Sequence, residues 1–402
     1  MRSSISAVFA SVLISPFPTQ HDNVAWVCMC ATGETARVAA KVRQHLSNAD
    51  TLALGDSGHV KVMGHLGEGR FSHVLLGETE RCSQVALKFA LNPAWSLSQE
   101  AAVLRVMHAT AGFPALVHHQ TASSTSTGAE MVAMELLGPS LEKLWETTTT
   151  STQFSGPTVL RAGCGVLRCL RSLHKSGFVH NDLKPANVVL GAAGSGREAD
   201  IHLLDFNLAT QIIGGHAPQG ALEERVGTPL FASIAAHEGR PTSAADDIES
   251  LAYCLSFLAT GRLPWLHKRH SKALFMKRRM ITDGCEVMTD SCAADALTED
   301  VQASAAVDAL QVYQEQAVDG HELTLTLTLT FIPHSSLLTP HTSPFISPSP
   351  SPSPFTLTLT LTQALWAEVI AYHETGEEVD YEACLAALDG FDDVPYDWER
   401  RR

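Results

Sequence analysis

One eight-residue run, from His180 to Asn187 (His-Asn-Asp-Leu-Lys-Pro-Ala-Asn), constrains the fold and chemistry of this chain more than any other feature. Asp182 can accept a proton from a hydroxyl group, and Asn187, five positions later, can reach a metal ion. Between them, Lys184 can reach a phosphate group during its transfer. Such a run can arise by chance, so its meaning depends on whether partner motifs occur in order elsewhere in the chain.

A glycine-rich turn lies upstream, between two alternating apolar segments that predict strands. Gly67 and Gly69 have no side chain, so backbone amides there can approach phosphate oxygens closely. Ser72 is a small residue at the place of a third glycine, and it still permits close approach. For a Gly-x-Gly pair alone, an ordinary β-turn is the alternative. The Val85–Lys88 segment that follows favours the phosphate-binding interpretation.

Lys88 and two carboxylates complete the set. Lys88 is expected on a buried strand, where it can neutralise the α- and β-phosphates. Glu100, near the start of an Ala- and Leu-rich helical stretch, can hold Lys88 in an ion pair, although alone it would be a solvated helix carboxylate. An apolar strand from Ile201 to Leu204 leads to Asp205, a candidate magnesium ligand. Asn207 follows, and asparagine tolerates the left-handed backbone angles that this turn requires.

In this order the motifs resemble those of the eukaryotic protein kinases, and more narrowly those of the casein kinase 1 group. Three stretches carry the narrower resemblance: Met134–Glu142, Gly227–Ile234, and Asp246–Tyr253 followed by Gly261–Trp265. The vaccinia-related kinases match Leu263–Trp265 about as well. The resemblance implies an α+β, two-lobed protein kinase fold, with a small antiparallel β-sheet N-lobe containing one helix and a larger, mainly helical C-lobe.

The resemblance also divides the chain. We expect a flexible leader over residues 1–58, a kinase domain over 59–392 and a C-terminal tail over 393–402; the domain comprises an N-lobe (59–134), a hinge (135–138) and a C-lobe (139–392). Residues 323–362 interrupt it with alternating Thr-Leu runs around a Ser-Pro repeat. We interpret them as a surface insertion; a repeated or unspliced coding segment is the alternative.

The implied function is that of a serine/threonine protein kinase, which transfers the γ-phosphate of ATP to protein hydroxyl groups with the help of Mg²⁺. The implied catalytic residues are Asp182, Lys184, Lys88 and Glu100, and the implied metal ligands are Asn187 and Asp205. The implied nucleotide contacts are Leu66, Gly67, Glu68, Gly69, Ser72, Val74, Ala86, Lys88, Met134, Glu135 and Leu137, with Met134 as gatekeeper.

Two predicted helices support the catalytic loop. Residues 159–174 form an amphipathic helix that leads into it, and residues 244–260 form a helix that is apolar on nearly all sides. Asp247, near the start of the second helix, can brace the backbone of the catalytic loop; an ordinary first-turn acid is the alternative.

The departures from the family pattern concern phosphate recognition. Asn181 replaces the arginine that holds a phosphorylated activation loop in most kinases, and Leu230 and Ala244-Ala245 replace the group's substrate-reading arginines. We therefore expect activity without activation-loop phosphorylation and no preference for phosphorylated or acidic substrates. A pseudokinase scaffold, suggested by Asn181 and Asn207, remains the main alternative, and a small-molecule kinase is a second.

Charge and cysteine content limit the partners. The net charge of -15 argues against nucleic-acid binding, and the nine scattered cysteines indicate reduced thiols in an intracellular protein. No apolar stretch reaches the roughly 20 residues of a membrane span. We expect a cytoplasmic or nuclear monomer that acts on proteins. Residues 1–20 permit a targeting peptide, but a plain leader is the preferred interpretation.

Overall fold

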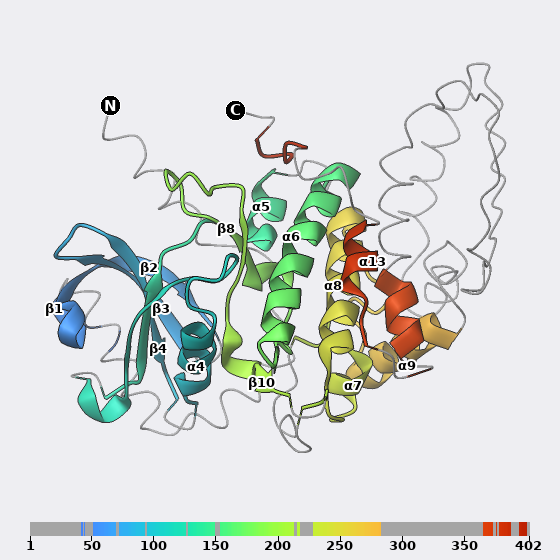
Figure 1. The fold of residues 1–402 in the computed structure, drawn as a ribbon, viewed down its shortest axis with the longest axis horizontal. Helices are drawn as coiled ribbons and strands as arrows, with labels where there is room; N and C mark the ends of the chain where they lie inside the picture. Colours follow the sequence, from blue (N-terminus) through green and yellow to red (C-terminus); the bar gives the residue numbers. More distant parts are fainter. Residues whose placement is uncertain are drawn as a thin grey trace.

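The computed structural model describes residues 42, 44, 51–69, 72–92, 95–125, 128–148, 153–212, 215–217, 228–282, 365–372, 375, 378–386 and 394–399. The expected insertion at 323–362 and most of the expected leader lie outside these residues. The described residues form two lobes, one built on a sheet and one on helices, as the sequence predicts (Figure 1).

The N-lobe is an antiparallel sheet of six strands in the order β1-β2-β3-β4-β6-β5. The strands are β1 (Thr51–Ala53), β2 (His59–Glu68), β3 (Ser72–Thr79), β4 (Gln84–Ala90), β5 (Leu116–Gln120) and β6 (Met131–Glu135). Helix α4 (Ser98–Val106) packs beside it, and Gly55–Ser57 and Ala122–Ser124 form short 3-10 turns, η1 and η2.

The sheet starts earlier than we expected. Thr51–Ala53 pairs with β2, with Leu52 opposite Val60, inside the segment we took for a flexible leader. Leu52 and Leu54 are buried against Val60 and other apolar side chains of the sheet. The sequence did not reveal β1, because a three-residue strand is too short to show the alternation that identifies longer strands.

The two faces of this sheet pack into different hydrophobic clusters. Val85, Leu87 and Phe89 of β4 alternate onto the outer face, where they join the small apolar cluster of the N-lobe. Ala86 and Lys88 alternate onto the opposite face, and their register partners Met134 and Val132 belong to the large core that continues into the C-lobe. Lys88 therefore faces the C-lobe.

The C-lobe is mainly helical. Its helices are α5 (Leu141–Thr148), α6 (Gly156–Lys175), α7 (Ile234–His237), α8 (Ala244–Thr260), α9 (His270–Thr282) and α13 (Tyr381–Ala386). Two small antiparallel pairs join β7 (Phe178–Val179) to β10 (Thr210–Gln211), and β8 (Val188–Leu190) to β9 (Ile201–Leu203). Short 3-10 turns, η3 (Pro185–Asn187) and η4 (Phe206–Leu208), lie next to the second pair.

Helix α8 runs through the middle of this lobe beside α6 (Figure 1). A capping box between Ser243 and Asp246 starts α8, and Gly261, with φ of 69°, ends it in the left-handed conformation that glycine adopts readily. Nearly all of its side chains are buried, as the apolar sequence of this segment predicts.

The junction between the lobes is short. β6 ends at Glu135 and α5 begins at Leu141, so the expected hinge of residues 135–138 joins the lobes directly. Gly138 donates its backbone N–H to the carbonyl of Leu190 at 2.8 Å, and a Cβ there would come within 2.5 Å of the carbonyl of Gly191. Only glycine permits this close approach.

Two described residues near the C-terminus pack against the C-lobe. Tyr396, expected in the tail of 393–402, is only 1% exposed, and the Arg161 guanidinium lies 3.9 Å above its ring. Asp397 accepts hydrogen bonds from the Ser155 N–H at 2.7 Å and hydroxyl at 2.6 Å, at the start of α6. Tyr396 and Asp397 thus pack against the C-lobe, beyond the domain end that we expected at residue 392. Within the described residues, no helix combines the length and the apolar character needed to cross a membrane.

Candidate active site

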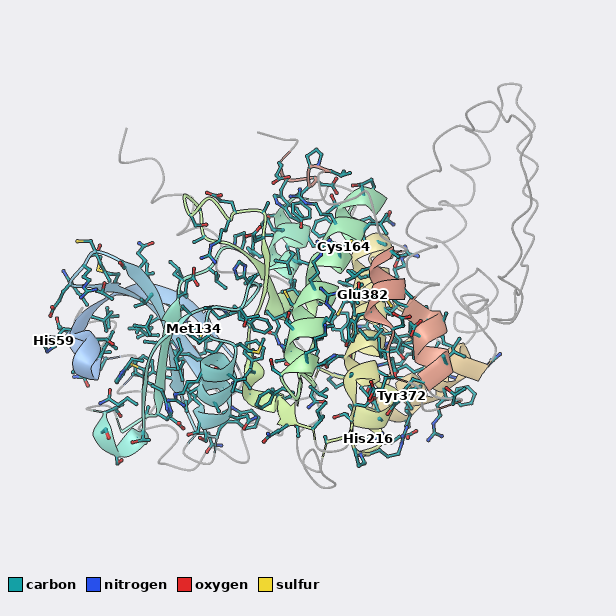
Figure 2. The ribbon with its side chains drawn as sticks, viewed as in Figure 1. His59, Met134, Cys164, His216, Tyr372 and Glu382 are labelled. Atoms are coloured by element: carbon teal, nitrogen blue, oxygen red, sulfur yellow. The ribbon has the colours of Figure 1, made fainter. Side chains whose placement is uncertain are left out.

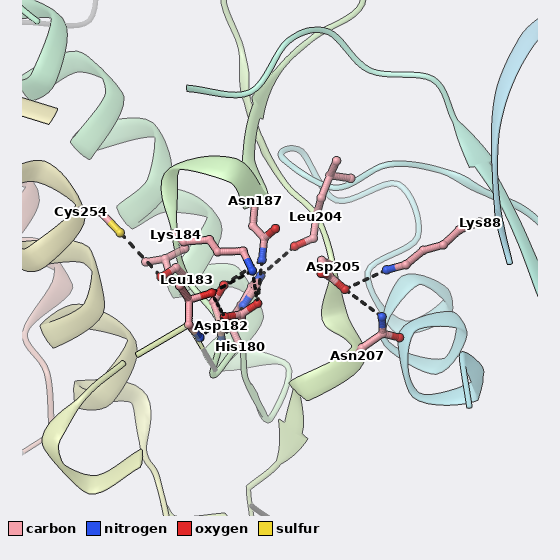
Figure 3. A network of polar contacts seen from close by, with 11 residues as sticks. Lys88, His180, Asp182, Leu183, Lys184, Asn187, Leu204, Asp205, Asn207 and Cys254 are labelled. Atoms are coloured by element: carbon pink, nitrogen blue, oxygen red, sulfur yellow. Dashed lines mark hydrogen bonds and ion pairs between the residues drawn. The ribbon is translucent and has the colours of Figure 1, made fainter. Parts of the chain in front are cut away.

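Lys88 lies at the centre of a network of charges between the lobes. Its Nζ lies 2.7 Å from Glu100 of α4 and 2.8 Å from Asp205, just after β9. Lys88 is 6% exposed and Glu100 is 1% exposed. Three segments that are far apart in the sequence therefore meet at one amino group, and the ion pair expected between Lys88 and Glu100 is present (Figure 3 shows Lys88 with Asp205).

Burial and charge compete at these groups. Burial lowers the pKa of Lys88, but the carboxylates of Asp205 and Glu100 outweigh it and raise the pKa above its ordinary value. For Asp205, burial raises the pKa, but the Lys88 ammonium outweighs it and lowers the pKa to about 2. Burial raises the pKa of Glu100, and Lys88 opposes that shift. Lys88 and Asp205 are accordingly charged at neutral pH.

The catalytic loop gathers Asp182, Lys184 and Asn187 around one carboxylate (Figure 3). Lys184 donates to Asp182 at 2.7 Å, and the Asn187 amide donates to the Asp182 carbonyl at 2.8 Å. Thr228 donates its backbone N–H to the other Asp182 oxygen at 2.8 Å and its hydroxyl at 3.1 Å. Asp182 is thus fixed from both the loop and the segment after the activation loop.

Asp247 braces the backbone of this loop, as the sequence suggested. Its carboxylate accepts the N–H of His180 at 2.7 Å, the N–H of Asn181 at 2.9 Å and the His174 ring at 2.8 Å. Asp247 is 1% exposed. Burial opposes its ionisation, but the hydrogen bond and charge of His174 and the N–H of His180 outweigh burial and hold the pKa of Asp247 below its ordinary value.

Asn181 connects three segments through uncharged hydrogen bonds. Its amide nitrogen donates to the Leu208 carbonyl at 3.0 Å and the Thr210 hydroxyl at 3.1 Å, and its amide oxygen accepts the Thr242 hydroxyl at 2.7 Å. Its φ is 66°, a left-handed angle that asparagine adopts more easily than most residues. Asn181 therefore links the catalytic loop, the start of the activation segment and the approach to α8 without carrying a charge.

The turn after β9 differs from our expectation. The left-handed residue is Asp205, with φ of 65°, whereas Asn207 lies in the 3-10 turn η4 and has no positive φ. Asn207 instead donates its side-chain amide to the Asp205 carboxylate at 2.8 Å. Its role in this structure is to orient Asp205 rather than to supply an unusual backbone angle.

The predicted adenine-binding residues lie at the hinge and on the sheet face that carries Lys88. Val74 is paired with Lys88, and Ala86 with the buried Met134, so these side chains share that face. Met134 lies on β6 in the sheet of the N-lobe (Figure 2), one residue before the hinge begins. Glu135 forms an ion pair with Arg197 and accepts the N–H of Ala115 at 3.2 Å. Leu137 follows in the hinge and is half-buried.

The glycine-rich turn connects β2 and β3. The Gly69 N–H donates to the Ser72 carbonyl at 2.8 Å, which closes the turn. A Cβ on Gly67 would meet no atom within 4 Å, so the space beside its backbone is open. Leu66 is the extra residue of a β-bulge, and Glu68 is exposed. The open space beside Gly67 is compatible with the close approach of phosphate oxygens that we expected there.

The donor set suits a magnesium ion. Asp205 offers a carboxylate, and Asn187 donates through its amide nitrogen, which leaves its amide oxygen for a cation. Hard oxygen donors of this kind are those that Mg²⁺ prefers, alongside phosphate oxygens and water. Asn187 and Asp205 therefore remain the candidate metal ligands, and a bound ion would neutralise charge on the phosphates.

Sequence reasoning missed three supporting contacts at this site. Thr228 reaches Asp182, the His180 ring donates to the Leu204 carbonyl at 3.0 Å, and the Phe206 ring, fully buried, lies 5.2 Å from the His180 ring. The motifs contained these residues, but their partners are distant in the sequence. Their place within a recognised motif is the only signal in the sequence that pointed to these residues.

Comparison with known proteins supports the same assignment. The protein kinase domain model matches residues 60–311. The chain is 35% identical over 170 residues to casein kinase 1-like protein HD16 of Oryza sativa subsp. japonica, covering 41% of this chain and 24% of that protein. It is 28% identical over 239 residues to casein kinase I homolog 1 of Saccharomyces cerevisiae, covering 58% of this chain and 43% of that protein. It is 29% identical over 214 residues to casein kinase I homolog 3 of Schizosaccharomyces pombe, covering 52% of this chain and 47% of that protein.

The chain thus spans less than half the length of these three relatives. Among solved structures, vaccinia related kinase 3 matches with a TM-score of 0.55 and 14% identity, covering 87% of this chain and 94% of that one, a likeness that concerns the fold alone. The domain model covers more than half of the 402 residues. With the Lys88, Asp182 and Asp205 motifs in their expected order, this chain belongs to the protein kinase domain family.

Proposed function

We propose that this chain is an ATP-dependent serine/threonine protein kinase similar to casein kinase 1. The observation that carries the proposal is the position of the Lys88 amino group, 2.7 Å from Glu100 and 2.8 Å from Asp205. This arrangement of the lysine, the helix glutamate and the metal-binding aspartate is the one that phosphoryl transfer requires in protein kinases. The similarity to casein kinase 1 proteins of rice and of two yeasts supports this class of reaction.

The residues divide the reaction between positioning and electrostatics. Lys88, held by Glu100, binds the α- and β-phosphates, and the glycine-rich turn covers them. Asp182 orients the incoming hydroxyl and accepts its proton, while Lys184 stabilises the charge on the transferred group. Lys184 already lies 2.7 Å from Asp182, so the two groups act at one place. Magnesium, when bound by Asn187 and Asp205, supplies further positive charge to the phosphates.

Activation of this kinase requires no phosphate on the activation segment. Asn181 already connects the catalytic loop to Leu208 and Thr210 by neutral hydrogen bonds of 3.0 and 3.1 Å. A phosphate on the segment would find no guanidinium at this position, because asparagine carries no charge. Phosphatase treatment should therefore leave the rate unchanged, and a large loss of rate would contradict this part of the proposal.

The substrate need not carry phosphate or acidic residues. Leu230 and Ala244-Ala245 occupy positions where the casein kinase 1 group has arginines. A lysine does lie behind this segment, but the Lys277 amino group is fully buried and donates to the carbonyls of Pro229 at 3.0 Å and Ala232 at 2.6 Å. A buried amino group that already donates to two backbone carbonyls cannot reach a substrate phosphate. A peptide with a phosphoserine before the acceptor should react no faster than its unphosphorylated twin.

A labelled-ATP assay tests the proposal. Incorporation of γ-phosphate into dephosphorylated casein is measured for the wild type, for Asp205→Ala and for Asp200→Ala, a control at an exposed aspartate beside the same strand. We expect phosphoserine or phosphothreonine from the wild type and the control, and a loss of several orders of magnitude in Asp205→Ala. No incorporation by any variant would instead favour the scaffold alternative.

The compartment and the oligomeric state are also proposals. Cys164, Cys169 and Cys254 are buried thiols, which fits the reducing compartment, cytoplasm or nucleus, that we expected (Figure 2 places Cys164 in the helical lobe). We propose that the kinase is a monomer. Sedimentation of the purified chain tests this directly.

A further inference from the structure

Two histidines and a glutamate gather on the outer side of the glycine-rich hairpin. The His65 and His73 rings lie 4.6 Å apart, and His73 Nδ1 lies 3.5 Å from the Glu68 carboxylate. One side-chain donor atom from each of the three lies within 4.8 Å of the other two. The two histidines have no part in the chemistry described above. Glu68 was expected to contact the nucleotide because of its place in the glycine-rich turn.

A β-bulge brings these side chains together. The register pairs His65 with Leu75, Gly67 with Val74 and Glu68 with His73, so β2 contains one extra residue between the first two pairs. Without this bulge, residues three positions apart in β2 would point to opposite faces of the sheet. The extra residue reverses the alternation, and His65 and Glu68 then share a face with His73.

This face is the one opposite the nucleotide. His73 is paired with Phe89 and Leu75 with Leu87, and both partners belong to the outer apolar cluster. Val74, by contrast, is paired with Lys88 on the inner face. The three side chains therefore lie on the back of the hairpin whose front covers the phosphates, at the β2 and β3 edge of the sheet (Figure 1 shows these strands).

The donors match a transition-metal ion. Two imidazole nitrogens and one carboxylate oxygen form a ligand set of catalytic zinc sites, whereas Mg²⁺ favours oxygen donors alone. Tetrahedral coordination at about 2.1 Å places ligand atoms about 3.4 Å apart. The donor atoms lie within 4.8 Å of one another, so they must approach by at most about 1.4 Å to reach that spacing. His73 is 3% exposed and fixed, while His65 is half-buried and Glu68 exposed, so the latter two can move.

We propose that His65, Glu68 and His73 form a binding site for a divalent transition-metal ion, with Zn²⁺ as the expected ion, on the outer face of the β2–β3 hairpin. The bound ion joins β2 to β3 directly beside Gly67 and Gly69. It therefore restricts the movement of the turn that covers the nucleotide phosphates. This effect on the turn rests on the proposed function, whereas metal binding itself does not.

Cobalt binding by the full chain, without nucleotide because ATP chelates metals, tests the site. Co²⁺ is titrated as a coloured substitute for Zn²⁺, and Zn²⁺ is then used to displace it. The variants are His65→Gln and Glu68→Gln, both at positions with exposed surface. The matched control is His59→Gln, because His59, at the start of β2, and Glu80, just after the end of β3, form an exposed histidine–glutamate pair at 2.9 Å. His73 is left unchanged because it is buried.

We expect one Co²⁺ per chain with a visible spectrum lacking intense thiolate bands, and displacement by Zn²⁺. Removal of one ligand should weaken binding by about 10- to 100-fold or more, since even residues that only orient ligands have effects of that size. His59→Gln should bind as the wild type does. Absence of binding, equal binding by all variants, or a spectrum dominated by thiolate ligands would each overturn the proposal.

A second readout separates this proposal from the proposed function. In the wild type, Zn²⁺ should change the KM for ATP at concentrations that leave His65→Gln unaffected. If the chain transfers no phosphate but binds Co²⁺ as described, the metal site stands and the kinase proposal fails. If phosphate transfer is normal but Co²⁺ binding fails, the metal site alone is refuted.

Discussion

Replacement of Asp247 with asparagine should impair catalysis without touching ATP or metal. The Asp247 carboxylate accepts three hydrogen bonds, from His180, Asn181 and His174, at 2.7, 2.9 and 2.8 Å. An asparagine keeps the shape but replaces one acceptor oxygen with a donor, so at least one backbone N–H of the catalytic loop faces another donor. The catalytic loop should then shift, although every catalytic residue remains present.

The size of the effect follows from these contacts. Each hydrogen bond to a buried charged group contributes about 1.5–3 kcal/mol, so loss of one bond with a donor left unpaired should cost about 2–4 kcal/mol. That corresponds to a fall in Tm of roughly 4–10 °C. A displacement of the reacting groups by about 1 Å can cost about 100-fold in rate. We therefore expect kcat to fall about 100-fold while the KM for ATP stays within a few-fold.

Asp246→Asn is the matched control. Asp246 lies in the same turn of α8, is 6% exposed and closes the capping box with Ser243, but no hydrogen bond in the described structure links it to the catalytic loop. Burial, helped by the charge of Glu249, raises the pKa of Asp246 to about 6, so a neutral substitute costs less here. Steady-state kinetics and thermal unfolding of both variants decide the matter. Equal kcat losses in the two variants, or a normal kcat in Asp247→Asn, would refute the reasoning.

Three further predictions concern other parts of the site and its surroundings. Glu100→Gln should lower kcat at least tenfold and raise the KM for ATP, because Lys88 loses one of its two anionic partners; kinetics with a folded variant check this. Asn181→Ala should lower the free energy of unfolding by about 1–3 kcal/mol through lost hydrogen bonds and by about 1–2 kcal/mol through backbone strain at a left-handed angle. Urea unfolding of Asn181→Gly, which loses the hydrogen bonds without the strain, separates the two contributions. Burial lowers the pKa of Lys277 to about 7. Between about pH 7 and 10, the unfolded chain therefore binds more protons at this lysine than the folded chain does. The contribution of Lys277 to the free energy of unfolding should rise across this range by up to about 1.4 kcal/mol per pH unit. The difference between wild type and Lys277→Met in urea unfolding should show that slope; a difference independent of pH would contradict it.

The motifs predicted the centre of the site well because their chemistry needs particular residue types close together in sequence. Lys88, Asp182 and Asp205 each lie within a short strand or loop whose pattern is local. Glu100 was less certain alone, since a helix carboxylate acquires its meaning only from its partner, and that partner lies on another element.

The structural features that the sequence did not predict depend on contacts between residues that are far apart in the chain. Thr51–Ala53 is too short to show a strand period, and it becomes a strand because β2 offers it an edge. The Tyr396 side chain is buried because Arg161, far away in the sequence, covers it. We expected Asn207 to take a left-handed backbone angle, but Asp205 takes that angle, and the Asn207 amide donates a hydrogen bond to the Asp205 carboxylate.

The bulge in β2 shows the same limit at the level of a single residue. A regular strand would place His65 and Glu68 on opposite faces of the sheet. One additional residue in the pairing reverses this and gathers two histidines and a glutamate. Neither the composition of the segment nor its spacing predicts the bulge, because the pairing partner determines the register.

The most direct test of the central claim is single-turnover transfer of γ-phosphate from ATP by Asp182→Asn, compared with the wild type. Asp182 is held by Lys184 and Thr228, and the isosteric amide changes its proton affinity while filling the same volume. If Asp182 accepts the hydroxyl proton, the transfer rate should fall by at least about 100-fold with ATP affinity unchanged. A transfer rate within a few-fold of the wild type in a folded Asp182→Asn variant would contradict the account.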